Sequence, residues 1–469
     1  MRWRASEVAA AVGGTLVGPD TEVRGVTVDS RRVAPGQLFV PVRAARDGHR
    51  FVAAALDAGA AAYLTAEPPL AGDGRHPAVV VADTVAALAD LGRAARRRLP
   101  ERVVGVTGSA GKTSTKDLLA AALDGPFRPT ASERSFNNEL GVPLTLANAP
   151  DDADVAVVEM GARGPGHIRS LCDVARPTVG VVTNVGLAHT EMLGSLDGVA
   201  RAKSELVEAL PATGTAVLNA DDHRVAAMAA ATAARVLTFG LDAGDVRAEG
   251  LAVDDELRPR FRLATEWGSA AVALSVRGAH HAANALAAAA AALAVGAPLD
   301  AVVAGLGRAR LSPWRMELAR SAGGGLVLND AYNANPASTE AALRSLAALP
   351  ARRRVAVLGP MLELGPYEAS EHGRMGALAA DLGVDLVVSV GAPAYGVTDV
   401  ADVDAAAALV GPVAEGDAVL VKGSRAAGLE RLAATLLAAT FRAPSAGGPA
   451  PAGGGLTPPA PPPSGVAAW

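Results

Sequence analysis

The 469-residue sequence contains a single cysteine, Cys172, which excludes both an intramolecular disulfide framework and a cysteine-rich zinc site. Such scarcity is typical of a reducing compartment. The first twelve residues include Arg2, Arg4 and Glu7 and lack the apolar core of a signal peptide. We therefore expect a soluble, cytoplasmic protein.

An excess of basic residues and a membrane-spanning run are also missing. Lysine and arginine number 43 against 48 acidic residues, and this net charge of −5 argues against nucleic acid as a partner. The longest apolar stretch, 282–299, is mostly alanine and contains Asn284, Gly296 and Pro298, so it predicts a buried helix and no membrane insertion. Half of the residues are hydrophobic, enough for roughly three domains of about 150 residues each.

Lysine is the scarcest charged residue. Only four of the 43 basic residues are lysines, and the other 39 are arginines. The guanidinium of arginine is planar, bulky and permanently charged. Each remaining lysine is therefore a candidate for a position where an arginine would fail. They are Lys112, Lys116, Lys203 and Lys422.

Apolar runs predict strands in three successive α/β segments. Nearly continuous apolar runs separated by helical patterns indicate a parallel sheet covered on both faces. In the middle of the chain these runs are 103–107, 155–159, 179–183 and 216–219. Shorter strands are expected at 23–28, 37–42 and 78–81. One helix is expected at 51–59, and a second follows the strand 78–81 and continues to residue 91. The last segment has strands at 325–328, 354–358, 386–390 and 418–421.

The predicted fold class is α/β with three domains. We expect a small N-terminal α/β domain at 1–100, a central parallel-sheet ATPase domain with a P-loop at 101–312, and a Rossmann-like α/β domain at 313–443. Residues 444–469 hold eight prolines and six glycines, which predicts a disordered tail.

The sharpest motif is a glycine-rich loop between the strand 103–107 and a predicted helix. Such a loop surrounds phosphate oxygens with backbone N–H groups and a helix N-terminus. Its lysine places a charge on the β- and γ-phosphates, and the following hydroxyl binds Mg²⁺. Val106 replaces the first glycine of the strict pattern, which leaves a shorter form. We expect ATP to contact Thr107, Gly108, Ser109, Ala110, Gly111, Lys112 and Thr113.

This shorter loop, together with later motifs, resembles the Mur ligases, bacterial enzymes that form the amide bonds of peptidoglycan precursors. The matching elements run from about residue 20 to 435. They are S-F-N-N-E-L-G-V-P at 135–143, E-M-G at 159–161, T-N-V-G-L-A-H at 183–189, A-K-S-E at 202–205, W-R-M-E at 314–317, N-D-A-Y-N-A-N-P at 329–336, L-G-P-M-L-E-L-G at 358–365 and V-K-G-S at 421–424.

The A-Y-N-A-N-P and M-L-E-L-G signatures are similar to those of the Mur ligases that use UDP-N-acetylmuramoyl-tripeptide and D-alanyl-D-alanine. The resemblance implies these two compounds as partners, ATP and Mg²⁺ as cofactors, and a monomer. The peptide carboxylate would attack the γ-phosphate of ATP, and the amine of D-alanyl-D-alanine would attack the resulting acyl phosphate. Catalysis would rest on positioning and charge neutralisation.

Two residues are candidates for the metal site beside Thr113. Glu159 ends a predicted parallel strand, at the edge where open α/β sheets place ligands, and its carboxylate completes a site of hard oxygen ligands. His189 follows the strand 179–183 at the same edge and is a candidate for a second metal or the substrate carboxylate. We therefore expect catalytic roles for Lys112, Glu159 and His189.

Lys203 is the fourth expected catalytic residue. In the Mur family the matching lysine is carbamylated by CO₂, so that it presents anionic oxygen near the metal. Carbamylation needs a primary amine that can lose its proton, which arginine does not have. A lysine at 203 in this arginine-rich sequence favours that chemistry, and a surface lysine paired with Glu205 is the alternative.

The resemblance also assigns nucleotide and substrate contacts. Asn284 would bind adenine, Arg315 the phosphates and Asp330 the ribose hydroxyls. The D-S-R element would bind the uridine nucleotide. The expected substrate contacts are Ser30, Arg31, Asn137, Asn138, Tyr332, Asn333 and Asn335. The chain departs from the family pattern at His281, usually asparagine, and at Pro360, usually an acid.

Three other functions stay open from the sequence. The preceding ligase of the pathway adds a diamino acid to the UDP-linked dipeptide, but its D-N-P-R element is absent here. A nucleotide-binding regulator without catalysis is favoured only by His281 and Pro360. A P-loop NTPase coupled to a protein partner is the third.

Overall fold

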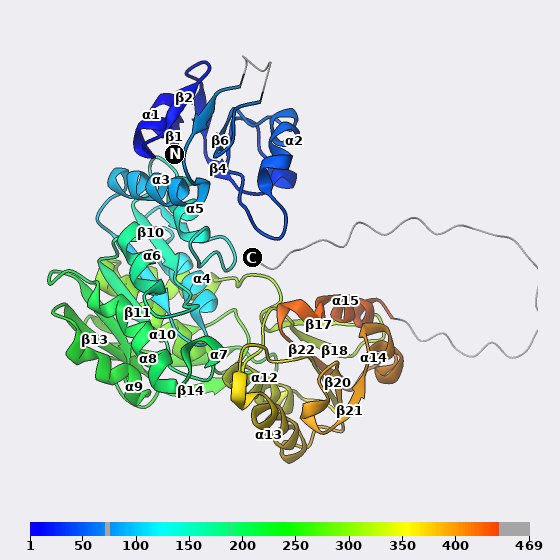
Figure 1. The fold of residues 1–469 in the computed structure, drawn as a ribbon. Coiled ribbons are helices and arrows are strands. Elements are labelled where there is room, and N and C mark those ends of the chain that lie inside the picture. The colour runs from blue at the N-terminus through cyan, green and yellow to red at the C-terminus, as the bar shows by residue number, and fades with distance from the viewer. Residues whose placement is uncertain (71–75, 189, 440–469) are drawn as a thin grey trace, which may run out of the picture.

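The computed structural model describes residues 1–70, 76–188 and 190–439. Figure 1 shows three α/β segments, with the N-terminal one above the central one and the C-terminal one at its side. His189 and the predicted tail at 444–469 lie outside the described residues. Within the described ranges, no helix combines the length and apolar character needed to cross a bilayer.

The N-terminal segment contains two small sheets. Strands β1 (Arg2–Arg4) and β3 (Glu22–Arg24) pair in antiparallel fashion. A five-stranded sheet has the order β2-β7-β6-β5-β4, made of β2 (Thr15–Val17), β4 (Val26–Thr27), β5 (Leu38–Phe39), β6 (Ala62–Thr65) and β7 (Ala78–Val80). The single strand predicted at 23–28 is wrong, because Gly25 at φ +82° breaks it between two sheets. A Cβ at Gly25 would come within 2.6 Å of Asn148 Oδ1.

The helices of this segment are α1 (Ala5–Ala11), α2 (Val52–Asp57) and α3 (Thr84–Arg98). Asp83 caps α3 by accepting from the N–H groups of Val85 and Ala86 at 2.7 and 2.9 Å. Helix α3 packs against α5 (Gly141–Ala147), and a Cβ at Gly92 would lie 2.8 Å from Pro143 Cα. One hydrophobic core therefore joins the N-terminal segment to the central one, and the boundary at residue 100 stays a prediction.

The central segment is built on a nine-stranded sheet of order β16-β15-β14-β13-β12-β11-β8-β10-β9. The strands predicted here are confirmed, and the sheet is parallel from β9 to β14. Strands β15 and β16 extend it in antiparallel fashion, and β15 alternates buried and exposed residues over most of its length, as a one-sided strand does. The strands are β8 (Val103–Thr107), β9 (Pro129–Ala131), β10 (Val155–Glu159), β11 (Val179–Val182), β12 (Thr215–Asn219), β13 (Arg235–Gly240), β14 (Val246–Val253), β15 (Pro259–Thr265) and β16 (Gly268–Ala273).

Strand β8 holds the key position in this sheet. It lies between β10 and β11, so the chain order reverses beside it, and the crevice at such a point binds ligands in open α/β sheets. Helix α4 (Lys112–Leu123) leaves this crevice and packs against α10 (His281–Val295). The buried helix predicted at 282–299 is thus confirmed up to Val295, where Gly296 at φ +98° ends it. The other helices are α6 (His167–Ala175), α7 (Thr190–Leu193), α8 (Leu196–Glu208), α9 (His223–Ala226) and α11 (Leu299–Arg308).

The C-terminal segment is a six-stranded sheet of order β17-β18-β22-β19-β20-β21, parallel except for β17. The four predicted strands are present as β18 (Leu326–Asp330), β19 (Arg353–Leu358), β20 (Leu386–Val390) and β22 (Asp417–Lys422). The edge strands are β17 (Glu317–Arg320) and β21 (Thr398–Val400), and the helices are α12 (Pro336–Ala348), α13 (Glu368–Asp381), α14 (Val403–Val410) and α15 (Glu430–Ala438). The α/β fold class is confirmed.

Candidate functional site

A cavity of about 1230 Å³ lies where the three segments meet, at the carboxyl end of β8. Most of the predicted site residues line it: Arg31, Ser109, Ala110, Gly111, Lys112, Thr113, Asn137, Asn138, Glu159, Asn284, Arg315, Asp330, Tyr332, Asn333 and Asn335. Four predicted residues do not line it, namely Ser30, Thr107, Gly108 and Lys203. His189 lies outside the described residues.

The glycine-rich loop is held in shape by the residues after β11. Gly108 at φ +151° and Gly111 at φ +81° need glycine, because a Cβ there would overlap Thr183 and Asn284 respectively. The Ala110 N–H donates to Asn184 Oδ1 at 2.8 Å, and Thr183 Oγ1 donates to Ala110 O at 2.6 Å. The loop is therefore preformed.

Lys112 begins α4 and points back over the loop. Its Nζ donates to Gly108 O at 2.7 Å. Burial lowers the pKa of this amine, Glu159 opposes that shift, and the nearby positive charge of Arg315 adds to it. Burial disfavours the charged form of this amine, and an anionic ligand beside it would stabilise that form.

Glu159 ends β10 and is 1% exposed. Its two carboxylate oxygens accept from Thr113 Oγ1 and from Asn137 Nδ2, each at 2.8 Å. Among the described residues these side-chain donors are neutral, and no ion pair to Glu159 is present. A buried carboxylate beside a hydroxyl is a hard-oxygen donor set, and it fits Mg²⁺.

The first turn of α10 closes one wall of the cavity. Asn284 Oδ1 accepts from Thr115 Oγ1 at 3.4 Å, and its Nδ2 donates to His281 Nδ1 at 3.0 Å. Because Nδ1 accepts, the ring proton of neutral His281 is on Nε2, which is buried and has no hydrogen-bond partner among the described residues. The adjacent His280 ring lies 4.2 Å away. This wall offers a donor to a ligand.

The C-terminal segment supplies the opposite wall. Asp330 Oδ2 pairs with Lys422 Nζ at 2.6 Å, and Lys422 also donates to Asn333 O at 2.9 Å. The Arg315 guanidinium lies 4.3 Å from the ring centre of Tyr332. Arg315 Nε is buried and, within the part of the chain that the structure describes, has no hydrogen-bond partner.

The turn before β17 has a strained backbone on both sides of Arg315. Trp314 at φ +61° and Met316 at φ +52° both adopt the left-handed conformation that bulky side chains rarely take. The Met316 N–H donates to Asp330 Oδ1 at 3.2 Å and holds this turn on β18. Backbone strain of this kind is typical of functional sites.

The N-terminal segment reaches the cavity through its D-S-R turn. Arg31 pairs with Asp29 at 2.8 Å, and Arg32 pairs with Glu133 of the central segment at 2.8 Å. Asp29 caps the turn by accepting from the Arg31 N–H at 3.0 Å. Ser30 stands in the same turn, but it does not face the cavity.

Two of the predicted substrate residues carry structural hydrogen bonds. Asn138 Oδ1 accepts from the N–H groups of Leu140 and Gly141 at the start of α5. Asn335 caps α12 by accepting from the Ser338 N–H at 2.9 Å, and its Nδ2 donates to Ser109 O at 3.3 Å. Asn335 thus connects the C-terminal segment to the phosphate loop.

Lys203 is 1% exposed on α8, and burial together with the charge of Lys112 holds its pKa well below the usual value. The surface pairing with Glu205 is not present. The Glu205 carboxylate accepts from the N–H groups of Gly166 and Arg169 at 2.6 and 2.9 Å, at the start of α6. Burial and the charge of Lys112 therefore both favour the neutral form of this amine.

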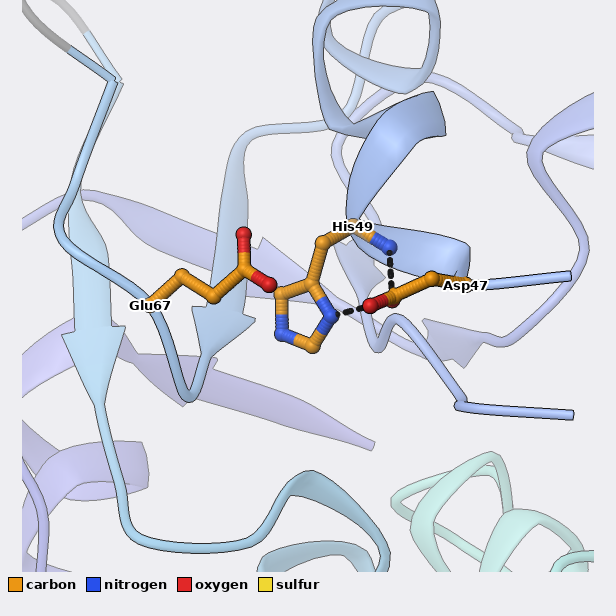
Figure 2. Close-up of side chains that lie close together, drawn as sticks. All are labelled: Asp47, His49 and Glu67. Atoms are coloured by element: carbon orange, nitrogen blue, oxygen red, sulfur yellow. Dashed lines mark hydrogen bonds and ion pairs between the residues drawn. The ribbon is translucent and has the colours of Figure 1, made fainter.

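A second cluster of metal-binding residue types, Asp47, His49 and Glu67, lies in the N-terminal segment (Figure 2). Both ring nitrogens of His49 are engaged: Nδ1 contacts Asp47 Oδ1 at 2.7 Å, and Nε2 accepts from the Ala66 N–H at 3.2 Å. Arg43 pairs with Asp47 and Glu67 at 3.2 and 3.1 Å. These contacts show that the three side chains and Arg43 stabilise a turn of the N-terminal segment by bonding to one another and to its backbone.

Lys116 and Lys422 are candidates from the scarcity of lysine alone, because the motifs predict no role for either. Lys116 and Lys422 are 2% and 1% exposed, and both donate to backbone carbonyls around the cavity. A planar guanidinium would not match the converging acceptors at either position, which are three around Lys116 and, at Lys422, Asp330 Oδ2 and Asn333 O.

Comparisons with known proteins agree with this geometry. The Mur ligase middle domain matches residues 106–292, and the Mur ligase glutamate ligase domain matches residues 314–425. The UDP-N-acetylmuramoyl-tripeptide--D-alanyl-D-alanine ligase of Mycobacterium tuberculosis is 41% identical, over 92% of this chain and 97% of the relative.

Solved structures are similar over most of the chain. A MurF structure from Acinetobacter baumannii has a TM-score of 0.83 at 32% identity and covers 93% of this chain and 99% of that one. MurF ligase from Thermotoga maritima in complex with ADP has a TM-score of 0.77 at 29% identity, over 88% and 97%. The chain belongs to the Mur ligase family.

Proposed function

We propose that the chain is an ATP-dependent ligase that joins D-alanyl-D-alanine to UDP-N-acetylmuramoyl-tripeptide, in the cytoplasm. The relative from Mycobacterium tuberculosis that carries this activity in its name spans nearly the whole chain. The three expected domains, 1–100, 101–312 and 313–443, would hold the UDP-linked peptide, ATP and the incoming amine respectively.

The observation that carries the proposal is the concentration of positive charge at the phosphate loop. Burial lowers the pKa of Lys112, and the charge of Arg315 lowers it further. Like charges held together in a cavity are stabilised by a polyanion. The triphosphate of ATP is such a ligand, and the preformed loop from Gly108 to Gly111 would surround it.

Mg²⁺ would be held by Glu159 and Thr113, whose oxygens lie 2.8 Å apart. When bound, it neutralises charge on the phosphates and orients them for transfer. The chain's own residues prepare this position, because Asn137 fixes the second oxygen of Glu159. His189 belongs to the same proposal as a further ligand.

Lys203 fits the same site only if its amine is not charged. An ammonium would be held close to Lys112, and the pKa of Lys203 is lowered for that reason as well as by burial. A neutral amine adds to CO₂ through a new N–C bond and releases one proton to solvent, which leaves a carbamate with a negative charge. Carbamylation would convert the Lys112–Lys203 repulsion into an attraction, and this supports the carbamate at Lys203.

In the proposed reaction, the tripeptide carboxylate attacks the γ-phosphorus of ATP, ADP leaves, and an acyl phosphate forms. The amine of D-alanyl-D-alanine then attacks the acyl carbon, the amide forms, and phosphate leaves. Lys112 would exchange its bond to Gly108 O for phosphate oxygens, and Arg315 would neutralise the transferred group. Asp330, fixed by Lys422, would bind the ribose.

The test uses the full chain with ATP, the UDP-linked tripeptide and D-alanyl-D-alanine, and follows ADP and the amide product by mass spectrometry. We expect ADP formation to depend on both substrates. ATP hydrolysis at a similar rate without them would favour an NTPase coupled to a partner. Product from the UDP-linked dipeptide and a diamino acid would favour the preceding ligase, and nucleotide binding without turnover would favour a regulator.

A further inference from the structure

Lys116 is buried on α4, one turn after the phosphate loop, and its three donors meet three acceptors. Its Nζ lies 2.7 Å from Ser132 O, 2.8 Å from Arg134 O and 2.8 Å from Asp117 Oδ1. The side chain is 2% exposed. An ammonium carries three N–H donors, so this environment satisfies it completely.

The two carbonyls belong to the loop that follows β9 and carries the N-N-E motif. The hydroxyl of Ser132 accepts from the Glu159 N–H at 3.1 Å, so the same residue touches both Lys116 and the end of β10. Arg134 has φ +50°, an uncommon conformation that the bond from Lys116 to its carbonyl stabilises. Directly after it, the Ser135 hydroxyl contacts the Tyr332 hydroxyl of the C-terminal segment.

The third contact connects Lys116 to the linker between the central and C-terminal segments. Asp117 pairs with Lys116 through Oδ1 and accepts from the Ser312 N–H through Oδ2 at 2.7 Å. Ser312 precedes the strained turn that holds Arg315. One buried ammonium therefore joins the phosphate helix, the N-N-E loop and, through Asp117, the linker.

We propose that Lys116 is a positioning residue for the nucleotide-linked peptide: it holds the loop 132–138 so that Asn137 meets Glu159 and Ser135 meets Tyr332. The inference rests on the proposed function for its substrate. Lys116 is not among the residues that line the cavity, so it acts through the loop and not by contact. Removing its ammonium leaves two carbonyls and one carboxylate without their partner in a buried place.

Two variants test the proposal. Lys116→Met removes all three bonds at nearly constant volume. Lys116→Arg keeps the charge next to Asp117, but its planar fork does not match three converging acceptors. For both we expect a rise of about tenfold in KM for the UDP-linked tripeptide and a fall in kcat, with KM for ATP within about twofold of wild type. Leu123→Val, in the core side of the same helix, is the control for lost packing, with an unchanged KM for the peptide.

Hydrogen exchange of the free protein gives a readout that needs no substrate. Amides of residues 132–138 should exchange about tenfold faster in both Lys116 variants than in wild type, while Leu123→Val leaves them unchanged. The same exchange pattern in all three variants, or wild-type exchange and kinetics in Lys116→Arg, would overturn the proposal. If wild type makes no amide product while the loop still loosens in the Lys116 variants, the proposed function fails and the positioning of the loop stands.

Discussion

Thr113 and Glu159 come from different elements, and their side-chain oxygens lie 2.8 Å apart. Thr113 is in the first turn of α4, and Glu159 is the last residue of β10, the strand next to β8. The register of the parallel sheet thus brings the phosphate loop and the acid to one edge. This contact is the basis of the first prediction.

Glu159→Gln should lower kcat by at least about 100-fold, because the amide removes the negative charge that would hold Mg²⁺. The change is nearly isosteric, and Asn137 and Thr113 remain within hydrogen-bond reach, so the fold should persist. Steady-state kinetics over a series of Mg²⁺ concentrations is the measurement. The Mg²⁺ concentration needed for half-maximal rate should rise.

Thr113 offers the matched control for this prediction. Thr113→Ser keeps the hydroxyl and should retain most of the activity, whereas Thr113→Val removes it and should resemble Glu159→Gln. Equal activity of the Ser and Val variants would contradict a role of the hydroxyl at the metal.

The second prediction concerns the carbamate. Lys203→Arg should lose most activity although the charge is kept, because a guanidinium forms no carbamate and would add a permanent cation beside Lys112. Lys203→Ala should be partly rescued by acetate, which supplies an anionic oxygen in the vacated space. Initial rates with increasing acetate, and with increasing chloride as the ionic-strength control, measure this.

A charged lysine that only attracts phosphate predicts the opposite order. The Arg variant would then be active, the Ala variant defective, and acetate without effect. An active Lys203→Arg variant would contradict the carbamate, but it would not contradict the roles proposed for the phosphate loop and Glu159.

Much of the central sheet could be predicted because its strands are buried on both faces. Continuous apolar runs gave β8 and β10 with the observed bounds, and the strands end at the residues that form the site. The antiparallel strands β15 and β16 are absent from the prediction. The alternation of Arg260, Phe261 and Arg262 is typical of a strand with one buried face, but it does not reveal which strand pairs with it. Pairing partners are a tertiary property.

The sequence predicts which residues gather at the site but not which role each of them has. Asn138 lies in the same motif as Asn137, and Asn335 lies in the N-D-A-Y-N-A-N-P motif, yet the side chains of Asn138 and Asn335 mainly cap helices. Capping depends on where α5 and α12 begin, which the motif alone does not reveal. For Lys116 the scarcity of lysine indicates a special position, but only its burial in the folded protein shows which contacts it makes.

The third prediction concerns His281, where the family usually has asparagine. Its Nε2 is a buried donor to which no described residue offers an acceptor, and a nucleotide acceptor in the cavity would satisfy it. His281→Leu should raise KM for ATP about tenfold with kcat little changed, the effect of one hydrogen bond of about 1.4 kcal/mol. His281→Asn should stay closer to wild type. KM for D-alanyl-D-alanine serves as the internal control, and a parallel rise in it would point to a general distortion.

The last prediction is a loss of stability in mild acid. Burial lowers the pKa of His280 to about 4, with Asp330 opposing and Lys422 adding to the shift, and it holds the pKa of His281 well below the usual value. In the unfolded chain both rings have a pKa of about 6.5. Below that pH the unfolded state binds more protons than the folded state. The free energy of unfolding therefore falls as the pH falls, and it recovers as the pH rises above about 6.5.

Urea unfolding at several pH values between 7.5 and 5 measures this effect. One fully buried neutral histidine contributes at most about 1.4 kcal/mol per pH unit, and the partly exposed position of His280 reduces its share. His281→Asn removes one titrating group and should flatten the curve between pH 6.5 and 5. His223→Asn, which changes an exposed histidine, should leave the curve as in wild type. A His281→Asn curve parallel to that of wild type would show that His281 takes up its proton equally in the folded and unfolded states, which would contradict the neutral ring that accepts from Asn284 Nδ2.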